Sequence, residues 1–193
     1  MHTTVQPSTL EDLLPRPHFC ERHQRRIAAP PPAVWDALHE LSLADLPLSR
    51  ALMEVRGLPE RLLGRPQSRI TTARLLEDGP VPVLVSDPWH SVLAGGVMQP
   101  WRLSGGATRP ELDASDLRAF DEPGWVKTAM DFVLEPDGEA TLLSTETRVR
   151  ATDARARRRF GLYWLAIRGG SGIIRRDLLR EVSHRAEAAT AST

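Results

Sequence analysis

The sequence predicts an α+β domain in which an antiparallel sheet packs against one long C-terminal helix. Residues 125–135 and 140–151 each alternate apolar with polar side chains, and the sequence Pro-Asp-Gly between them is typical of a hairpin turn. After Asp153 the apolar residues recur at helical spacing as far as Val182. Two paired strands followed by a long amphipathic helix therefore define the last third of the chain.

A short segment precedes the sheet. Residues 1–8 are polar, and we expect them to be frayed. Ser8 and Glu11 have the Ser-x-x-Glu spacing of a capping box, which predicts a short helix that ends before Pro15.

The first strand is predicted over residues 19–29. Phe19 and Ile27 share one face of this strand and indicate that the face is turned inward. His23 lies on the same face, close to Glu21, so we expect its imidazole inside the domain.

Two short helices are expected directly after this strand. Residues 30–32 are three prolines, which end the strand, and proline suits the first turn of a helix because its missing N–H would be unpaired there. The first helix is predicted over residues 33–41. The second helical region is predicted over residues 48–55 and continues at 58–63.

Strands return in the middle of the chain, separated by turn sequences rich in Asp, Gly and Pro. Gly95 and Gly96 lie inside one of them, where they indicate a bulge or the close approach of another segment. A short helix capped by Asp113 is predicted over residues 113–120. The strands are predicted over residues 69–76, 81–85, 90–98 and 101–103.

The last two strands and the final helix give the strongest patterns. We expect the Thr and Val face of the strands to turn inward and the charged face, which carries Lys127 and Arg148, to be solvated. Asp153 is predicted to cap the helix. Glycine costs a helix about 1 kcal/mol relative to alanine, so residues 169–172 predict a kink. The apolar stripe consists of Phe160, Tyr163, Trp164, Ile167, Ile174, Leu178 and Val182.

Composition bounds the class of protein. The chain has 193 residues, 41% of them hydrophobic, which predicts one domain over residues 16–188, a tail over 1–15 and a disordered tail over 189–193. Basic and acidic residues number 25 each, so no net field favours nucleic acid. Lys127 is the only lysine. The lone Cys20 excludes an internal disulfide, and no signal-peptide pattern occurs, so we expect a cytoplasmic protein.

Residues 27–38 read Ile-Ala-Ala-Pro-Pro-Pro-Ala-Val-Trp-Asp-Ala-Leu and resemble a motif of the START-like (SRPBCC) superfamily, where a first strand ends in Ala-Pro and a Val-Trp helix follows. This superfamily includes polyketide cyclases, plant pathogenesis-related allergens and lipid-transfer domains. Residues 21–23, 120–124, 145–149 and 160–176 resemble an uncharacterised bacterial branch of it. Gly169-Gly170 departs from the Pro-Gly expected in relatives.

The resemblance implies the helix-grip fold. In this fold a curved antiparallel sheet of six or seven strands wraps around the long C-terminal helix, and two short helices follow the first strand. An apolar cavity lies between the sheet and the helix, which implies binding of an apolar or amphipathic small molecule. The predicted ligand-binding residues are His23, Met98, Trp101, Met130, Thr145, Thr147, Tyr163, Trp164 and Ile167.

A purely structural role is open for each of these residues. Threonine is common in strands, aromatic residues are common in cores, and His23 can simply hydrogen-bond to Glu21.

Two other functions stay open. A cyclase, aromatase or dehydratase acting on a polyketide-like substrate would use His23 as base and Tyr163 or a threonine hydroxyl as acid. Binding without catalysis is favoured because only one inward histidine is available. The second alternative is an interaction module that uses the basic face of the final helix, which begins with Arg155.

Cofactors and macromolecular partners are not expected. The chain has no phosphate-binding Gly-x-x-x-x-Gly-Lys loop, no His-Glu-x-x-His motif and no paired cysteines, so neither a metal nor a nucleotide is predicted. The predicted partner is a small molecule rather than nucleic acid or a membrane, and the chain is expected to be a monomer or a homodimer.

Overall fold

The computed structural model describes residues 9–46, 74–77, 81–102, 108–109 and 112–191. The chain forms two compact units. Unit 1 comprises residues 1–23, 81–133 and 144–167, and unit 2 comprises residues 24–80, 134–143 and 168–193.

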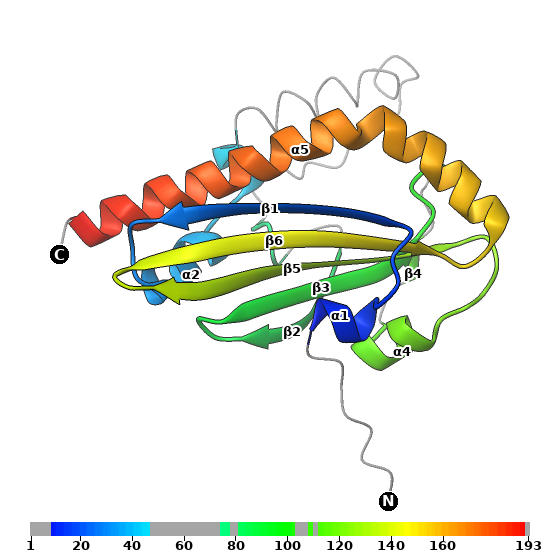
Figure 1. Cartoon of the computed structure of the whole chain (residues 1–193), viewed down its shortest axis with the longest axis horizontal. Helices are drawn as coiled ribbons and strands as arrows, with labels where there is room; N and C mark the ends of the chain where they lie inside the picture. The colour runs from blue at the N-terminus through cyan, green and yellow to red at the C-terminus, as the bar shows by residue number, and fades with distance from the viewer. Residues whose placement is uncertain (1–8, 47–73, 78–80, 103–107, 110–111, 192–193) are drawn as a thin grey trace, which may run out of the picture. The chain divides into compact units, whose positions relative to one another are not determined.

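The order of elements is the predicted one in outline: a first strand, a helix, further strands, and a long helix at the end (Figure 1). The helices are α1 (Leu10–Leu13), α2 (Pro31–His39), the 3-10 helix η1 (Leu43–Asp45), α4 (Ala114–Ala119) and α5 (Ala154–Ala191). The strands are β1 (Phe19–Ile27), β2 (Val83–Asp87), β3 (Ser91–Met98), β4 (Thr108–Arg109), β5 (Val126–Asp137) and β6 (Ala140–Ala151).

The strands form one sheet in the order β1-β6-β5-β3-β2, and the two-residue β4 pairs with β3 beside this row. β3 runs antiparallel to β2, β4 and β5. The predicted antiparallel sheet and long C-terminal helix are confirmed. Within the described residues, the sheet has five strands in its row and the two-residue β4 beside it, where six or seven strands are predicted. The same residues contain one helix directly after β1, α2, where two are predicted.

Several predicted elements differ in detail. Of the strand predicted over residues 69–76, only the end is described: Arg74 forms an isolated bridge with Ser42, and a turn follows. Trp101 and Arg102 lie in a turn and an irregular segment, so the strand predicted there is wrong for these two residues. The helical region predicted over 48–63 lies outside the described residues.

Both faces of the sheet are covered in unit 1. On one face, Val126, Val149 and Ala151 pack with Ala156 and Phe160 of α5. On the other face, a second cluster joins the sheet to α1 and α4. It consists of Leu10, Leu13, Leu14, Leu93, Val97, Ala114, Leu117 and Ala129.

The prediction of a solvated charged face is therefore wrong for the part of that face that lies in unit 1. Lys127 is only 8% exposed, and the side chains of Glu146 and Arg148 are 16% and 15% exposed. These residues alternate with the α5-facing ones, as predicted, but Lys127 donates to the Arg118 carbonyl of α4 and Arg148 donates to Glu11 of α1.

Local capping explains where the helices of unit 1 begin. The Thr9 hydroxyl accepts a hydrogen bond from the Asp12 backbone N–H at 3.1 Å, so α1 is capped at Thr9 rather than at Ser8, which lies outside the described residues. Asp113 caps α4 by accepting from the Asp116 N–H at 2.8 Å, as predicted. Asp153 accepts from the Ala156 N–H at 2.7 Å and caps α5, also as predicted.

The glycines at 169–172 do not end α5, which continues through them and reaches Ala191. The helix thus includes residues 189–191 of the predicted C-terminal tail. No described helix combines the length and the apolar character that crossing a membrane requires.

In unit 2, α2 begins at Pro31, so the prolines occupy its first turn as expected. The buried Thr141 hydroxyl donates to the Ala29 carbonyl at 2.8 Å, and Arg185 forms an ion pair with Asp45 at 2.6 Å. The core of this unit includes Ile27, Val34, Leu38, Leu41, Leu46, Leu143, Leu178 and Val182.

Candidate functional site

An aromatic cluster lies on the α5-facing side of the sheet in unit 1. The rings of Phe19 and Phe160 meet edge-on with centroids 4.9 Å apart, and Phe160 and Trp164 stack at 5.8 Å. Tyr163 lies 5.8 Å from Phe160. Each such pair contributes about 0.5–1.5 kcal/mol beyond the burial of apolar area. The cluster fixes the first half of α5 against β1 and the neighbouring strands.

Four of the nine predicted ligand-binding residues meet at this cluster. Met98, Trp101, Tyr163 and Trp164 are partly buried, and all four pack against the core that contains Phe160. They come from the end of β3, the segment after it, and two successive positions of α5. Side chains from separate parts of the chain thus line one apolar surface.

Three further predicted residues lie on the same side of the sheet. Thr145 and Thr147 alternate in phase with Val149, and Met130 alternates in phase with Val126. Ile167, also predicted, is half-buried on α5, three residues beyond Trp164.

His23 forms the hydrogen bond to Glu21 that a purely structural role predicts. Its Nε2 lies 2.8 Å from Glu21 Oε1, and both side chains are 17% exposed. Because an ionised carboxylate only accepts, Nε2 carries the proton in this pair. Nδ1 of the neutral ring is then the atom with a free lone pair.

Three buried side-chain polar atoms of the described residues have no hydrogen-bond partner: Thr145 Oγ1, Trp101 Nε1 and Gln99 Oε1. Thr145 is 1% exposed and Gln99 is 7% exposed. Leaving such an atom unpaired costs about 1–3 kcal/mol, and most buried polar groups in proteins avoid that cost. Two of the three atoms belong to residues that the sequence predicts at a ligand site.

Gln99 is the residue that sequence reasoning missed. Its Nε2 donates to the Gly124 carbonyl at 2.8 Å, which leaves only the amide oxygen unpaired. Met98 and Trp101, close to it in the sequence, are large apolar residues that suggest a cavity wall, whereas a single glutamine next to Pro100 belongs to no recognisable motif.

The opposite face of the sheet carries a charged network instead. Arg148 donates to Glu146 at 2.6 Å and to Glu11 at 2.7 Å, and the Cys20 thiol donates to Glu146 at 3.2 Å. Burial alone would raise the pKa of Glu146, but the hydrogen bonds from Arg148 and Cys20 outweigh it and lower that pKa. Burial raises the pKa of Asp131, which accepts from the Glu146 N–H at 2.9 Å.

The basic face of α5, on which the predicted interaction module rests, is solvent-exposed in unit 1. Arg155, Arg158 and Arg159 are exposed, and Leu162 and Leu165 beside them are each 73% exposed. A docking role for this face stays a prediction. Among the residues that the structure describes, no three His, Cys, Asp or Glu side chains are grouped to hold a metal ion.

No family model and no curated protein matches the chain. Solved structures with a similar arrangement include the Zhui aromatase/cyclase from Streptomyces sp. R1128 (14% identity, 89% of this chain and 97% of that chain, TM-score 0.32). CalU16 from Micromonospora echinospora is 16% identical over 89% of this chain and 86% of that chain, with a TM-score of 0.31. MLL2253 from Mesorhizobium loti is 15% identical over 86% and 98%, with a TM-score of 0.39.

The chain is thus similar in structure, at low identity, to the Zhui aromatase/cyclase, and its membership of the START-like (SRPBCC) superfamily stays a prediction. The sheet order and the long C-terminal helix form a helix-grip-like topology. One fold hosts many unrelated activities, so the function of this protein depends on its own site residues.

Proposed function

We propose that the protein binds an apolar or amphipathic small molecule on the α5-facing side of the sheet in unit 1. The observation that carries this proposal is the Thr145 hydroxyl, which is fully buried on that side without a hydrogen-bond partner. A ligand that forms a hydrogen bond with this hydroxyl offsets the free-energy cost of leaving it buried and unpaired.

The remaining contacts define the chemistry of such a ligand. Burial of its apolar surface against the aromatic cluster contributes about 25 cal/mol per Å². The indole Nε1 of Trp101 only donates, so it favours a carbonyl or hydroxyl oxygen of the ligand, while the Gln99 oxygen only accepts. An apolar body with one or two oxygen functions satisfies both demands.

Native mass spectrometry of freshly purified protein tests the proposal directly, with a co-purified small molecule as the expected result. Titration with the neutral fluorescent probe N-phenyl-1-naphthylamine tests the same surface in protein stripped of ligand. Saturable enhancement of the probe's fluorescence is expected, and the absence of both a co-purified molecule and probe binding contradicts the proposal.

A pair of threonine variants sharpens the test. Thr145→Val removes an unpaired hydroxyl, so the free energy of unfolding of the empty protein should stay unchanged or rise, while probe or ligand affinity changes. Thr141→Val is the matched control on the same strand: it breaks the bond to Ala29 and should cost about 1–2 kcal/mol. An equal loss of stability in both variants would show that the Thr145 hydroxyl already has a partner.

The Glu21–His23 pair favours a second candidate function, catalysis of the cyclase, aromatase or dehydratase type. Glu21 orients the ring, and Nδ1 is the nitrogen able to accept a proton from a substrate. Tyr163 or a threonine hydroxyl on the same side would serve as the acid. With a linear poly-β-carbonyl substrate, His23→Gln should abolish product absorbance and leave probe binding intact; unchanged turnover would remove the enzymatic interpretation.

A further inference from the structure

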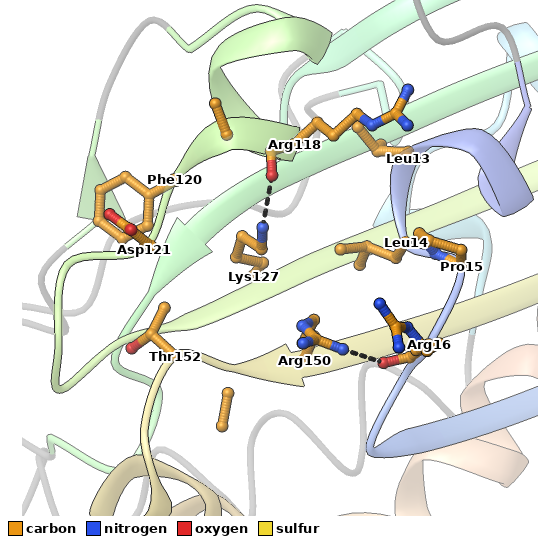
Figure 2. A pocket seen from close by; sticks show the side chains of 12 residues that line it. Leu13, Leu14, Pro15, Arg16, Arg118, Phe120, Asp121, Lys127, Arg150 and Thr152 are labelled. Atoms are coloured by element: carbon orange, nitrogen blue, oxygen red, sulfur yellow. Dashed lines mark hydrogen bonds between the residues drawn. The ribbon is translucent and has the colours of Figure 1, made fainter.

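A separate pocket of about 320 Å³ opens on the face of the sheet opposite α5 (Figure 2). Its walls come from the end of α1 and the segment after it, from the end of α4, and from β5 and β6, all within unit 1. We propose that this pocket binds a small organic oxyanion, a carboxylate or phosphate with a short apolar body. The proposal is independent of the ligand site beneath α5.

Lys127 is the central observation. The residue is 8% exposed, and its Nζ donates to the Arg118 carbonyl at 2.7 Å, as Figure 2 shows. Among the described residues, no carboxylate lies within ion-pair distance of this ammonium. Lysine is almost never buried without a charged partner, so a counter-anion is the group that this wall of the pocket lacks.

A second cation adds to the same field. Arg150 lines the pocket from β6 and donates to the Arg16 carbonyl at 2.7 Å (Figure 2). Burial lowers the pKa of Lys127, the positive charge of Arg150 lowers it further, and the Asp121 carboxylate raises it. Asp121 is exposed and is the one acid among the lining residues, which also include four cations: Arg16, Arg118, Lys127 and Arg150.

The rest of the lining sets the size and shape of the ligand. A volume of about 320 Å³ is near the lower end for small-molecule sites, which begin at about 300 Å³. Leu13, Leu14 and Phe120 supply apolar walls beside the cations. Leu13 and Leu14 are buried, whereas Phe120 is half-buried, and a ligand with a short hydrocarbon body would cover its exposed part, which a purely inorganic ion would leave in water.

The single lysine makes the test direct. In protein labelled with ¹⁵N-lysine, the one side-chain Nζ resonance reports on this pocket alone. Titration with hexanoate should shift that resonance saturably, and inorganic phosphate should shift it less, whereas neutral hexan-1-ol should leave it in place. At ten times the dissociation constant, hexanoate should raise Tm by about 3 °C or more.

Variants separate an anion site from a structural clamp. Lys127→Met keeps an unbranched side chain one atom shorter and removes the charge, so the hexanoate-dependent rise in Tm should be lost while Tm without ligand stays unchanged or rises. Arg158→Met removes one positive charge from an exposed position of α5 outside the pocket, and it should bind hexanoate as the wild type does.

If Lys127→Met fails to fold, Arg150→Met retains the Nζ signal and should weaken hexanoate binding at least tenfold. The proposal is overturned if hexanoate and phosphate both leave the Nζ resonance unmoved, or if Arg158→Met loses binding as fully as the pocket variants. Lys127 would then act only as a clamp that holds the end of α4 through the Arg118 carbonyl.

Discussion

The two faces of the sheet in unit 1 are built from neighbouring residues but hold opposite kinds of chemistry. On β5, Val126 joins the aromatic cluster under α5, while Lys127, the next residue, points to the other face and the cationic pocket. The α5-facing side carries the aromatic cluster, the Glu21–His23 pair and buried polar atoms without partners. The opposite side is charged, and Arg148 there is paired with two carboxylates.

The difference shows that the covering helix, rather than the strand pattern, decides what a face can do. Alternation assigns each residue to a face but does not say what lies above it. The α5 side is covered by a helix with a long apolar stripe. The other side is covered by the short helices α1 and α4, whose edges leave room for charged side chains and for the pocket.

The largest loss of folding stability is expected from truncating Phe160, the aromatic side chain at the centre of the α5-facing cluster. Phe160 is 3% exposed and contacts three other aromatic rings, so Phe160→Ala should lower the free energy of unfolding by about 3–5 kcal/mol in urea denaturation. Leu162→Ala, two residues away but 73% exposed, should stay within about 0.5 kcal/mol. Similar losses in both variants would contradict the assignment of the buried face of α5.

The next largest effect tests the charged side. Arg148→Met leaves Glu146 and Glu11 without their partner and should cost about 2–3 kcal/mol at pH 7. Because the folded-state pKa of Glu146 is lowered, its contribution is present above the unfolded pKa and is lost as pH falls through the folded pKa. The stability difference between wild type and variant should therefore shrink on acidification.

Asp131 tests the predicted direction of this pH dependence of stability. Burial raises its folded-state pKa, so its own contribution to stability changes in the opposite direction as pH falls. Asp131→Asn should make the acid-dependent loss of stability steeper. An Arg148→Met penalty that stays constant from pH 7 to pH 3 would show that packing, and not charge pairing, explains it.

Two adjacent glycines of β3, Gly95 and Gly96, point to opposite faces of the sheet, and replacing them should change stability by smaller amounts. A Cβ on Gly95 would lie 2.6 Å from Leu117 Cδ2 and 3.2 Å from the Thr128 carbonyl oxygen, whereas a Cβ on Gly96 would lie no closer than 3.8 Å to Pro82. Gly95→Ala should cost about 1–2 kcal/mol. Gly96→Ala should be neutral or stabilise by about 0.5 kcal/mol, because alanine restricts the unfolded chain. Equal effects would contradict the close packing of α4 on β3.

The smallest effect is chemical. Burial, and then the hydrogen bond to Glu146, raise the pKa of Cys20 to about 11. Iodoacetamide should therefore alkylate Cys20 at pH 8 roughly tenfold more slowly than free cysteine, because the thiolate is the reactive form. Glu146→Gln should accelerate alkylation, while Glu135→Gln, an exposed acid elsewhere on the strands, should not. Wild-type reactivity equal to free cysteine would show that the contact with Glu146 does not persist.

Much of the fold follows from local patterns. Residues 140–151 are predicted as a strand with the bounds that β6 has, because their alternation and the preceding Asp-Gly turn agree. Asp153 as a cap and the apolar stripe from Phe160 to Val182 follow from helical periodicity and cap chemistry in the same way.

The misses have one physical cause, which is contact over long sequence separation. Lys127 is predicted at the surface, yet the end of α4 and the segment after α1 lie around it. Neither of these short segments has a sequence pattern from which this contact could be predicted. The unpaired atoms of Gln99 and Thr145 are likewise invisible in the sequence, because pairing depends on the positions of distant groups. Met98, Trp101, Tyr163 and Trp164 pack against one core, and whether they and the other predicted residues bind a ligand stays a proposal.

Because Lys127 is the only lysine and is buried in the sheet, cleavage next to it can be used to measure opening of the sheet. A lysine-specific endopeptidase has one bond to cut in the whole chain, Lys127–Thr128, and that bond lies inside β5 between β6 and β3. Lys127 is the second residue of β5, so the cleavage rate should follow opening of this end of the strand from β6 and β3. Protection against this one protease thus measures how firmly the first residues of β5 stay paired in the sheet.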